Sequence, residues 1–177
     1  AGGETVFGAP EDISIADFEQ SIKSLVTGRF LMCQEAGKRM LAQGKGSIVN
    51  IGSIGGVSSL GRGQIAYFAA MGAVVQMVRG LATEWASRGV RVNAILPAQV
   101  LNPGLAERIE KTPEVLDTFL RGIPAGRMGQ PDDIRGLSVL LASDASAWIT
   151  GALIPMDGGN LALNAGGSYP GSPAASG

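Results

Sequence analysis

The chain has 177 residues, enough for one compact domain, of which 45% are hydrophobic and 16% are charged. Its formal net charge is −1, so composition gives no sign of a nucleic-acid or anionic-membrane partner. There is no histidine and a single cysteine, Cys33, which excludes imidazole catalysis, an internal disulfide and a cysteine-rich metal site. Because no 18 consecutive residues are apolar, we expect a cytoplasmic protein without a membrane span.

Predicted helices and strands alternate along the chain. They are, in order, a long helix from a capping box at Ser14 and Asp17 to about Gly44, a strand at 47–51, a helix at 64–87, a strand at 90–96, one or two short helices within 104–121, a helix from Pro131 to about Ala142, and a strand at 152–155. Helices of this length between strands predict right-handed crossovers in a mostly parallel, doubly wound α/β sheet.

Residues 1–163 form the predicted domain. The Ala/Gly/Ser/Pro-rich segment 164–177 is expected to be a flexible tail, or alternatively an arm laid over a partner subunit.

The helix at 64–87 is apolar on more than one side. One side can pack on the sheet, and the other must meet either a further helix of this chain or a second subunit. We favour a subunit, and therefore expect a homo- or hetero-oligomer formed through the helices around 15–43 and 64–87.

Two hydroxyl groups are placed to do chemistry. Ser53 follows the strand 47–51, and Tyr67 opens the next helix on the rim of the same crevice, at the carboxyl end of the strands where open parallel sheets bind ligands. Facing one carbonyl or alcohol, a serine can hydrogen-bond its oxygen while a tyrosine exchanges a proton with it. No metal site is predicted.

Several motifs stand in the order typical of one known family. They are GSIVNIGS at 46–53, AYFAAMGAV at 66–74, GVRVNAILP at 89–97, RMGQPDDI at 127–134, SDASAWITG at 143–151 and DGG at 157–159. With these motifs the chain resembles the short-chain dehydrogenase/reductase (SDR) family. The resemblance implies a Rossmann-like fold, an NAD(P) cofactor and a carbonyl or alcohol substrate.

The resemblance also implies a catalytic group of Asn, Ser, Tyr and Lys, of which this chain keeps half. Ser53 and Tyr67 match the serine and tyrosine, but Met71 stands at the lysine position and Leu25 at the asparagine position. In the family the lysine binds the nicotinamide ribose and its charge favours the tyrosinate; a thioether can do neither. No lysine or arginine lies near Met71 in the sequence to replace it.

The resemblance implies weak cofactor contacts at three further positions, Pro97, Val100 and Asn102, the last standing where the family has a threonine. The strand, glycine-rich turn and helix that bind the dinucleotide in the family have no counterpart in these 177 residues. Residues 1–3 resemble the end of the family's Asn-Asn-Ala-Gly motif. We therefore expect that the nucleotide-binding half of the fold precedes this sequence and that the chain does not bind NAD(P) unaided.

Three hypotheses follow. The first is a catalytically impaired structural or regulatory subunit, related to NAD(P)-dependent hydroxyacyl-type oxidoreductases, that assembles with an active SDR partner. The second is an active NAD(P)-dependent alcohol dehydrogenase or ketone reductase that works with Met71. The third is a lyase or dehalogenase-like descendant that binds a substrate oxygen through Ser53 and Tyr67. The missing lysine favours the first.

Overall fold

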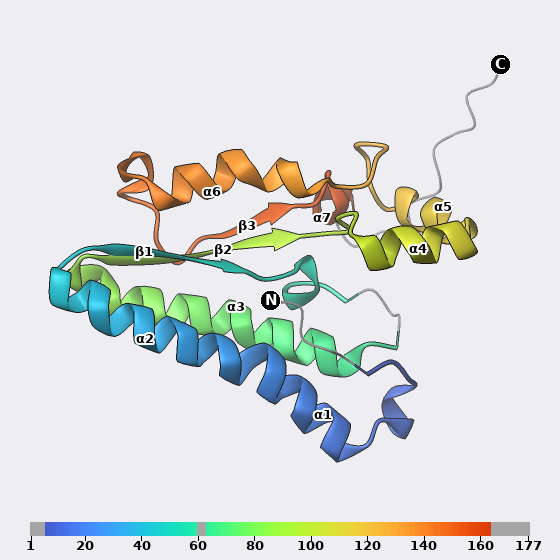
Figure 1. The fold of residues 1–177 in the computed structure, drawn as a ribbon, viewed down its shortest axis with the longest axis horizontal. Coiled ribbons are helices and arrows are strands. Elements are labelled where there is room, and N and C mark those ends of the chain that lie inside the picture. The colour runs from blue at the N-terminus through green and yellow to red at the C-terminus, as the bar shows by residue number, and fades with distance from the viewer. Residues whose placement is uncertain (1–5, 60–62, 164–177) are drawn as a thin grey trace.

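The computed structural model describes residues 6–59 and 63–163, so the predicted tail and residues 1–3 lie outside the described residues. Its strands are β1 (Gly46–Ile51), β2 (Val90–Pro97) and β3 (Leu153–Met156). They form one parallel sheet in the order β1-β2-β3. Helices α2 (Gly28–Gln43) and α3 (Ile65–Trp85) cover one face of this sheet, and α6 (Arg135–Ala142) covers the other (Figure 1). The predicted Rossmann-like α/β class with a parallel sheet is confirmed.

Further helices and helical turns complete the described chain. The helices are α1 (Ile15–Ile22), α4 (Pro103–Lys111), α5 (Glu114–Leu120) and α7 (Asn160–Leu163). The short turns are η1 (Pro10–Asp12), η2 (Lys23–Thr27), η3 (Ile54–Gly56), η4 (Ala86–Arg88), η5 (Pro131–Ile134) and η6 (Asp144–Ser146). The predicted strands are each within a residue or two of those observed.

The long first helix begins and ends as predicted but is interrupted in its middle. Ser14 caps it, because its Oγ accepts a hydrogen bond from the Asp17 backbone N–H at 3.1 Å. It ends at Gly44, which takes the left-handed conformation (φ 69°) that terminates helices. Between α1 and α2, η2 is a π-helical turn in which the Gly28 N–H donates to the Lys23 carbonyl, five residues back. The prediction of one regular helix missed this turn.

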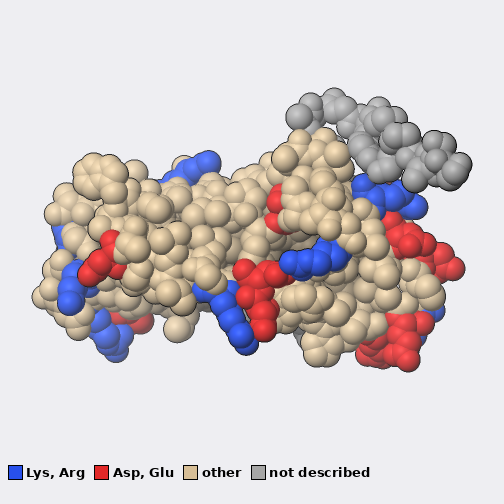
Figure 2. Space-filling model, turned by 90° about the horizontal axis from the view of Figure 1, so that it is seen from above, with Lys and Arg blue, Asp and Glu red and all other residues tan. Residues whose placement is uncertain are grey.

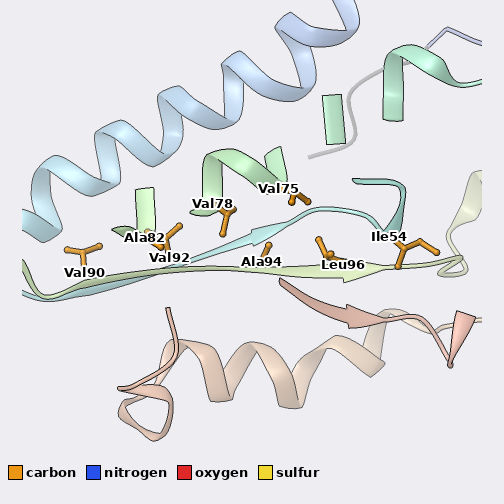
Figure 3. Packing of buried hydrophobic residues seen from close by; sticks show 8 residues of the cluster. All are labelled: Ile54, Val75, Val78, Ala82, Val90, Val92, Ala94 and Leu96. Atoms are coloured by element: carbon orange, nitrogen blue, oxygen red, sulfur yellow. The ribbon is translucent and has the colours of Figure 1, made fainter. Parts of the chain in front are cut away.

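The main core lies between β2 and α3. Alternate residues of β2 are fully buried and point toward α3, as the close view of the cluster shows (Figure 3). The cluster consists of Ile54, Val75, Val78, Ala82, Val90, Val92, Ala94 and Leu96. Burying this many aliphatic side chains is the chief stabilising contribution on this face of the sheet.

On the face of the sheet away from α3, polar side chains of β2 form hydrogen bonds to the segment that leads from α6 to β3. The Arg91 guanidinium donates to the carbonyls of Leu141 and Ser143, at 3.0 and 3.1 Å. Asn93 is completely buried, and its amide both donates to the Ile149 carbonyl and accepts from the Ala152 N–H, each at 2.9 Å. The central strand therefore holds both layers of the fold in place.

The second apolar side of α3 is covered by another helix of the same chain. A second buried cluster joins Leu25, Ala70, Met71 and Val74 to partly buried neighbours on α1, η2 and α3. Of the two alternatives that the sequence left open for this side, a helix of the same chain supplies this cover, and association with a second subunit stays a prediction. By length and composition alone, the segment Ile65–Arg88 could cross a membrane, but seven residues of α3 are buried inside the fold and six of these belong to the two clusters.

The face that carries α6 is mixed in character. Basic and acidic side chains are both distributed over it (Figure 2). Exposed apolar side chains stand among them, with Val139 on α6 68% exposed and Trp148 in the following loop fully exposed. Single exposed apolar residues are normal on protein surfaces.

Candidate active site

Ser53 lies where the sequence predicted, directly beyond β1. It caps η3, since its Oγ accepts a hydrogen bond from the Gly55 N–H at 3.0 Å. The Gly52 N–H donates to the Ile95 carbonyl of β2 at 2.8 Å, which fixes the backbone just before Ser53. The hydroxyl is partly exposed, so it keeps capacity to donate to a ligand.

Tyr67 lies in the first turn of α3, also as predicted, and is partly buried. Its ring meets that of Phe68 edge-on, with centroids 5.9 Å apart. The turn η3 packs directly on this end of α3: a side chain added at Gly55 would meet the Phe68 ring at 2.9 Å, and one at Gly56 the Met71 carbonyl at 2.6 Å. These two glycines let the loop carrying Ser53 approach the helix carrying Tyr67.

The two positions at which the sequence departs from the family are buried together. Leu25 in η2 is 3% exposed and Met71 in α3 is 1% exposed, and both belong to the cluster against which Tyr67 packs. Apolar side chains therefore fill the space beside Tyr67 that the resemblance assigned to an amide and an ammonium group. Their burial explains how the substitutions are accommodated, because an apolar side chain brings no polar atom that would need a partner there.

A cation nevertheless lies at this place. Arg29, in the first turn of α2, places its Nη1 4.0 Å from the Met71 Sδ and donates to the Leu25 carbonyl at 2.9 Å. The sequence places no basic residue near Met71 along the chain, but the fold brings Arg29 to it from another helix. Arg62, one of the two cations closest in sequence, lies outside the described residues. The signal that could have found Arg29 is a single charge inside the otherwise uncharged run of residues 24–34.

The electrostatics of this cluster link Arg29 to its neighbours. Partial burial lowers the pKa of Arg29, while its interactions with Tyr67 and Cys33 oppose that shift by favouring the charged guanidinium. Burial raises the pKa of the Cys33 thiol, which is partly offset by a hydrogen bond with Asn50 and by the charge of Arg29. A guanidinium retains its proton under all ordinary conditions, so Arg29 remains a fixed positive charge.

The predicted cofactor segment follows β2. Its extended chain pairs with Gly129, since the Leu101 N–H donates to the Gly129 carbonyl and the Gly129 N–H donates to the Gln99 carbonyl. Peptide groups alternate in direction along an extended chain, so the N–H and C=O of Val100 point to the opposite side. Asn102 caps α4, with its Oδ1 accepting from the Leu105 N–H at 3.0 Å, so its side chain is engaged in the fold.

Two grooves flank the site. One of about 350 Å³ lies toward β3; its lining includes Gln99, whose buried Oε1 has no hydrogen-bond partner within the described residues, and neither Ser53 nor Tyr67 lines it. The other, about 580 Å³, runs between α2 and β1 and is lined by Arg29, Cys33 and Asn50. Within residues 6–59 and 63–163, no group of three or more acidic or cysteine side chains could hold a metal ion.

Comparison with known proteins identifies the family. Residues 2–160 match the family model described as enoyl-(acyl carrier protein) reductase. The chain is 38% identical over 160 residues to 2-(S)-hydroxypropyl-CoM dehydrogenase 3 of Xanthobacter autotrophicus, covering 89% of this chain and 62% of that protein. It is 42% identical over 149 residues to D-threitol dehydrogenase of Mycolicibacterium smegmatis, covering 84% and 56%.

A solved structure of a related protein has the same fold as this chain. A protein of Beutenbergia cavernae, proposed to be an NAD(P)-dependent gluconate 5-dehydrogenase and crystallised with NADP, superposes with a TM-score of 0.84 at 35% identity, covering 91% of this chain and 64% of that one. The chain belongs to the short-chain dehydrogenase/reductase family. It spans about three fifths of the length of the relatives it matches.

Proposed function

We propose that the protein is an active NAD(P)-dependent dehydrogenase that interconverts a secondary alcohol and a ketone. The observation that carries this proposal is the packing of η3 on the start of α3, which gathers Ser53 and Tyr67 at the carboxyl end of β1. The relatives named above, which are described as dehydrogenases of hydroxylated compounds, support the same reaction class. This reverses the preference, drawn from the sequence, for an impaired subunit.

The chain's own groups would handle the substrate oxygen and its proton. Ser53 donates a hydrogen bond to the oxygen that is hydroxyl in one direction and carbonyl in the other. The Tyr67 phenolate accepts the hydroxyl proton during oxidation, and the phenol returns a proton during reduction. When bound, the dinucleotide would accept a hydride from the alcohol carbon during oxidation and would donate one to the carbonyl carbon during reduction.

Part of the cofactor site fits the residues present. The Val100 N–H and C=O face away from Gly129, and although the C=O accepts a 3.4 Å hydrogen bond from the Asn102 amide, its second lone pair and the N–H match the carboxamide of a nicotinamide. Pro97 ends β2 and sets the start of this segment. Asn102 contributes through α4 and the shape of the loop, not through a free side chain.

The substrate proposed is a small, hydroxylated molecule carrying a secondary alcohol. This class follows from the relatives, whose names specify D-threitol, gluconate and 2-(S)-hydroxypropyl-CoM. We also propose association through the helices 15–43 and 64–87, supported by three exposed apolar side chains of α2: Phe30, Leu31 and Met32.

The test is turnover by the purified full-length protein, because the nucleotide-binding strand, turn and helix of the family have no counterpart in these 177 residues. NAD⁺ and NADP⁺ are each supplied with D-threitol, gluconate and simple secondary alcohols, and absorbance at 340 nm is followed. We expect turnover in at least one combination, with Tyr67→Phe lowering kcat by roughly 100-fold or more. Ser58→Ala, which removes a hydroxyl that donates to the Ile54 carbonyl, is the control and should leave the rate nearly unchanged.

A catalytically impaired subunit remains the second candidate, because Met71 and Leu25 are buried apolar residues where the family resemblance assigned a lysine and an asparagine. It predicts no turnover alone and restored or altered turnover when the chain is mixed with a co-purifying SDR subunit. Absence of turnover together with absence of NADH and NADPH binding would favour this candidate over the active enzyme.

A further inference from the structure

Arg29 occupies an unusual position for a charged side chain. It lies on the helix α2 where α2 leaves the π-turn η2, and its guanidinium contacts two residues of the buried cluster on which Tyr67 packs. The contacts are the 2.9 Å hydrogen bond to the Leu25 carbonyl and the 4.0 Å approach to the Met71 Sδ. A hydrogen bond to its own helix holds the guanidinium against α3.

A fixed cation at this place has a definite chemical effect. A phenol that takes up and releases a proton becomes negatively charged, and a nearby positive charge stabilises that state. The effect is larger in a partly desolvated groove than in water, because the effective dielectric is lower. Arg29 is only partly exposed and reaches the buried Met71, which lies one helical turn after Tyr67 on α3, although Tyr67 itself does not line the groove.

We propose that Arg29 is a positioning residue that stabilises the Tyr67 phenolate, supplying from α2 the positive charge that residue 71 does not supply from α3. The proposal rests on the proposed function, in which Tyr67 exchanges the proton. It assigns to Leu25 a role through its backbone carbonyl, which anchors the guanidinium, while its side chain serves the core.

The surrounding charges leave Arg29 as the group that acts on Tyr67. The Cys33 thiol is the other ionisable group that interacts with Arg29, and burial raises its pKa, which keeps it neutral. Three charged residues of α1 and η2, the elements packed on α3, are exposed to solvent: Asp17, Glu19 and Lys23. Solvent screens exposed charges strongly.

The experiment titrates Tyr67 directly. The full chain is prepared with ¹³Cζ-labelled tyrosine, and the Tyr67 resonance is assigned by its loss in Tyr67→Phe. The variants are Arg29→Gln, Arg29→Met and Arg29→Lys. The matched control is Arg39→Gln on the same helix: Arg39 makes the same kind of bond to the carbonyl four residues back, at 3.0 Å, but is exposed.

We expect Arg29→Gln and Arg29→Met to move the midpoint of the Tyr67 titration to higher pH by about one unit, with Arg29→Lys moving it less and Arg39→Gln not at all. In the enzyme assay the pH profile of kcat for oxidation should shift in the same direction, with a smaller change in KM. An unchanged midpoint in whichever neutral variant retains the wild-type circular dichroism would overturn the proposal.

The two proposals fail in different ways. The titration needs no substrate or cofactor, so loss of the proposed function would show as absent turnover beside a normal Arg29 effect on Tyr67. Conversely, turnover by the wild-type chain with an Arg29-independent midpoint would refute the role of Arg29 alone.

Discussion

The Nη1 of Arg29 lies 4.0 Å from the Sδ of Met71, although 42 residues separate them in sequence. The methionine is buried and uncharged, and the arginine brings a positive charge to its side. Any cation introduced at residue 71 would therefore enter an apolar cluster that already has a guanidinium at its border.

This contact predicts that restoring the family lysine fails unless Arg29 is removed. Met71→Lys alone places two like charges in contact in a buried setting and should destabilise the fold by about 2 kcal/mol or more. The double variant Met71→Lys/Arg29→Met should recover stability and be at least tenfold more active than Met71→Lys. Thermal unfolding and kcat of both variants check this. A Met71→Lys protein as stable as the wild type and faster than the double variant would contradict it.

Ser53 should affect stability and activity together. Ser53→Ala removes the cap of η3, which should cost about 1 kcal/mol of unfolding free energy, and removes the hydrogen bond to the substrate oxygen, which should lower kcat by roughly 100-fold. Ser58→Ala is the control, because Ser58 lies just after the same turn and its hydroxyl donates to the Ile54 carbonyl. Chemical denaturation and steady-state kinetics separate the two effects. Equal losses of activity in both variants would argue against a direct role for Ser53.

Gly37 sets the approach of α2 to α3. A side chain there would meet the Trp85 ring at 2.5 to 3.0 Å, so Gly37→Ala should destabilise the fold by roughly 1–2 kcal/mol despite the better helix propensity of alanine. Gly80→Ala, in α3, meets no atom within 4 Å and should stabilise by up to about 1 kcal/mol. Urea unfolding of the pair is the measurement. The same sign of change in both variants would refute the packing argument.

The Arg127–Asp133 pair should make stability depend on acid pH. Two hydrogen bonds from Arg127, at 2.7 and 2.9 Å, and one from the Gln130 N–H lower the pKa of Asp133 from 3.8 to about 2. Because the folded-state pKa is the lower one, the contribution is full above about pH 4 and is lost as pH falls toward 2. Arg127→Gln should therefore destabilise at pH 6 and have less effect near pH 2.

Unfolding at the two pH values measures this difference. Arg135→Gln provides the control, since Arg135 pairs with the exposed Asp132 three residues away. A constant penalty for Arg127→Gln across this range would show that the pair contributes no pH-dependent stability.

Much of the fold could be predicted because local signals decided it. The cap at Ser14, the left-handed Gly44 and the stop at Pro97 mark element ends through backbone chemistry that depends on few neighbours. The π-turn η2 could not be predicted in this way. Its wide turn carries no distinctive residue type, and it forms where α1 and α2 both pack on α3.

The residues of the candidate site also differ in whether a local signal in the sequence places them. Ser53 and Tyr67 were predictable because each sits at a fixed place relative to a strand end or a helix start. The position of Arg29 beside Met71 was not predictable, because it results from a contact between two helices that are distant in sequence. The cover on the second side of α3 could not be assigned for the same reason: sequence shows that an apolar side must be covered, but not by which segment.

The π-turn also has a consequence for the spacing of the first helix. Its buried positions Ser21, Leu25, Cys33 and Gly37, with Arg29 between them, recur at multiples of four residues. In a regular α-helix each step of four residues overshoots a full turn by about 40°, so such a row would spiral away from α3. The wider winding at Lys23–Thr27 takes back part of that rotation. Losing one residue there would turn everything after it by about 100°, carrying Arg29, Cys33 and Gly37 off the neighbours they now meet.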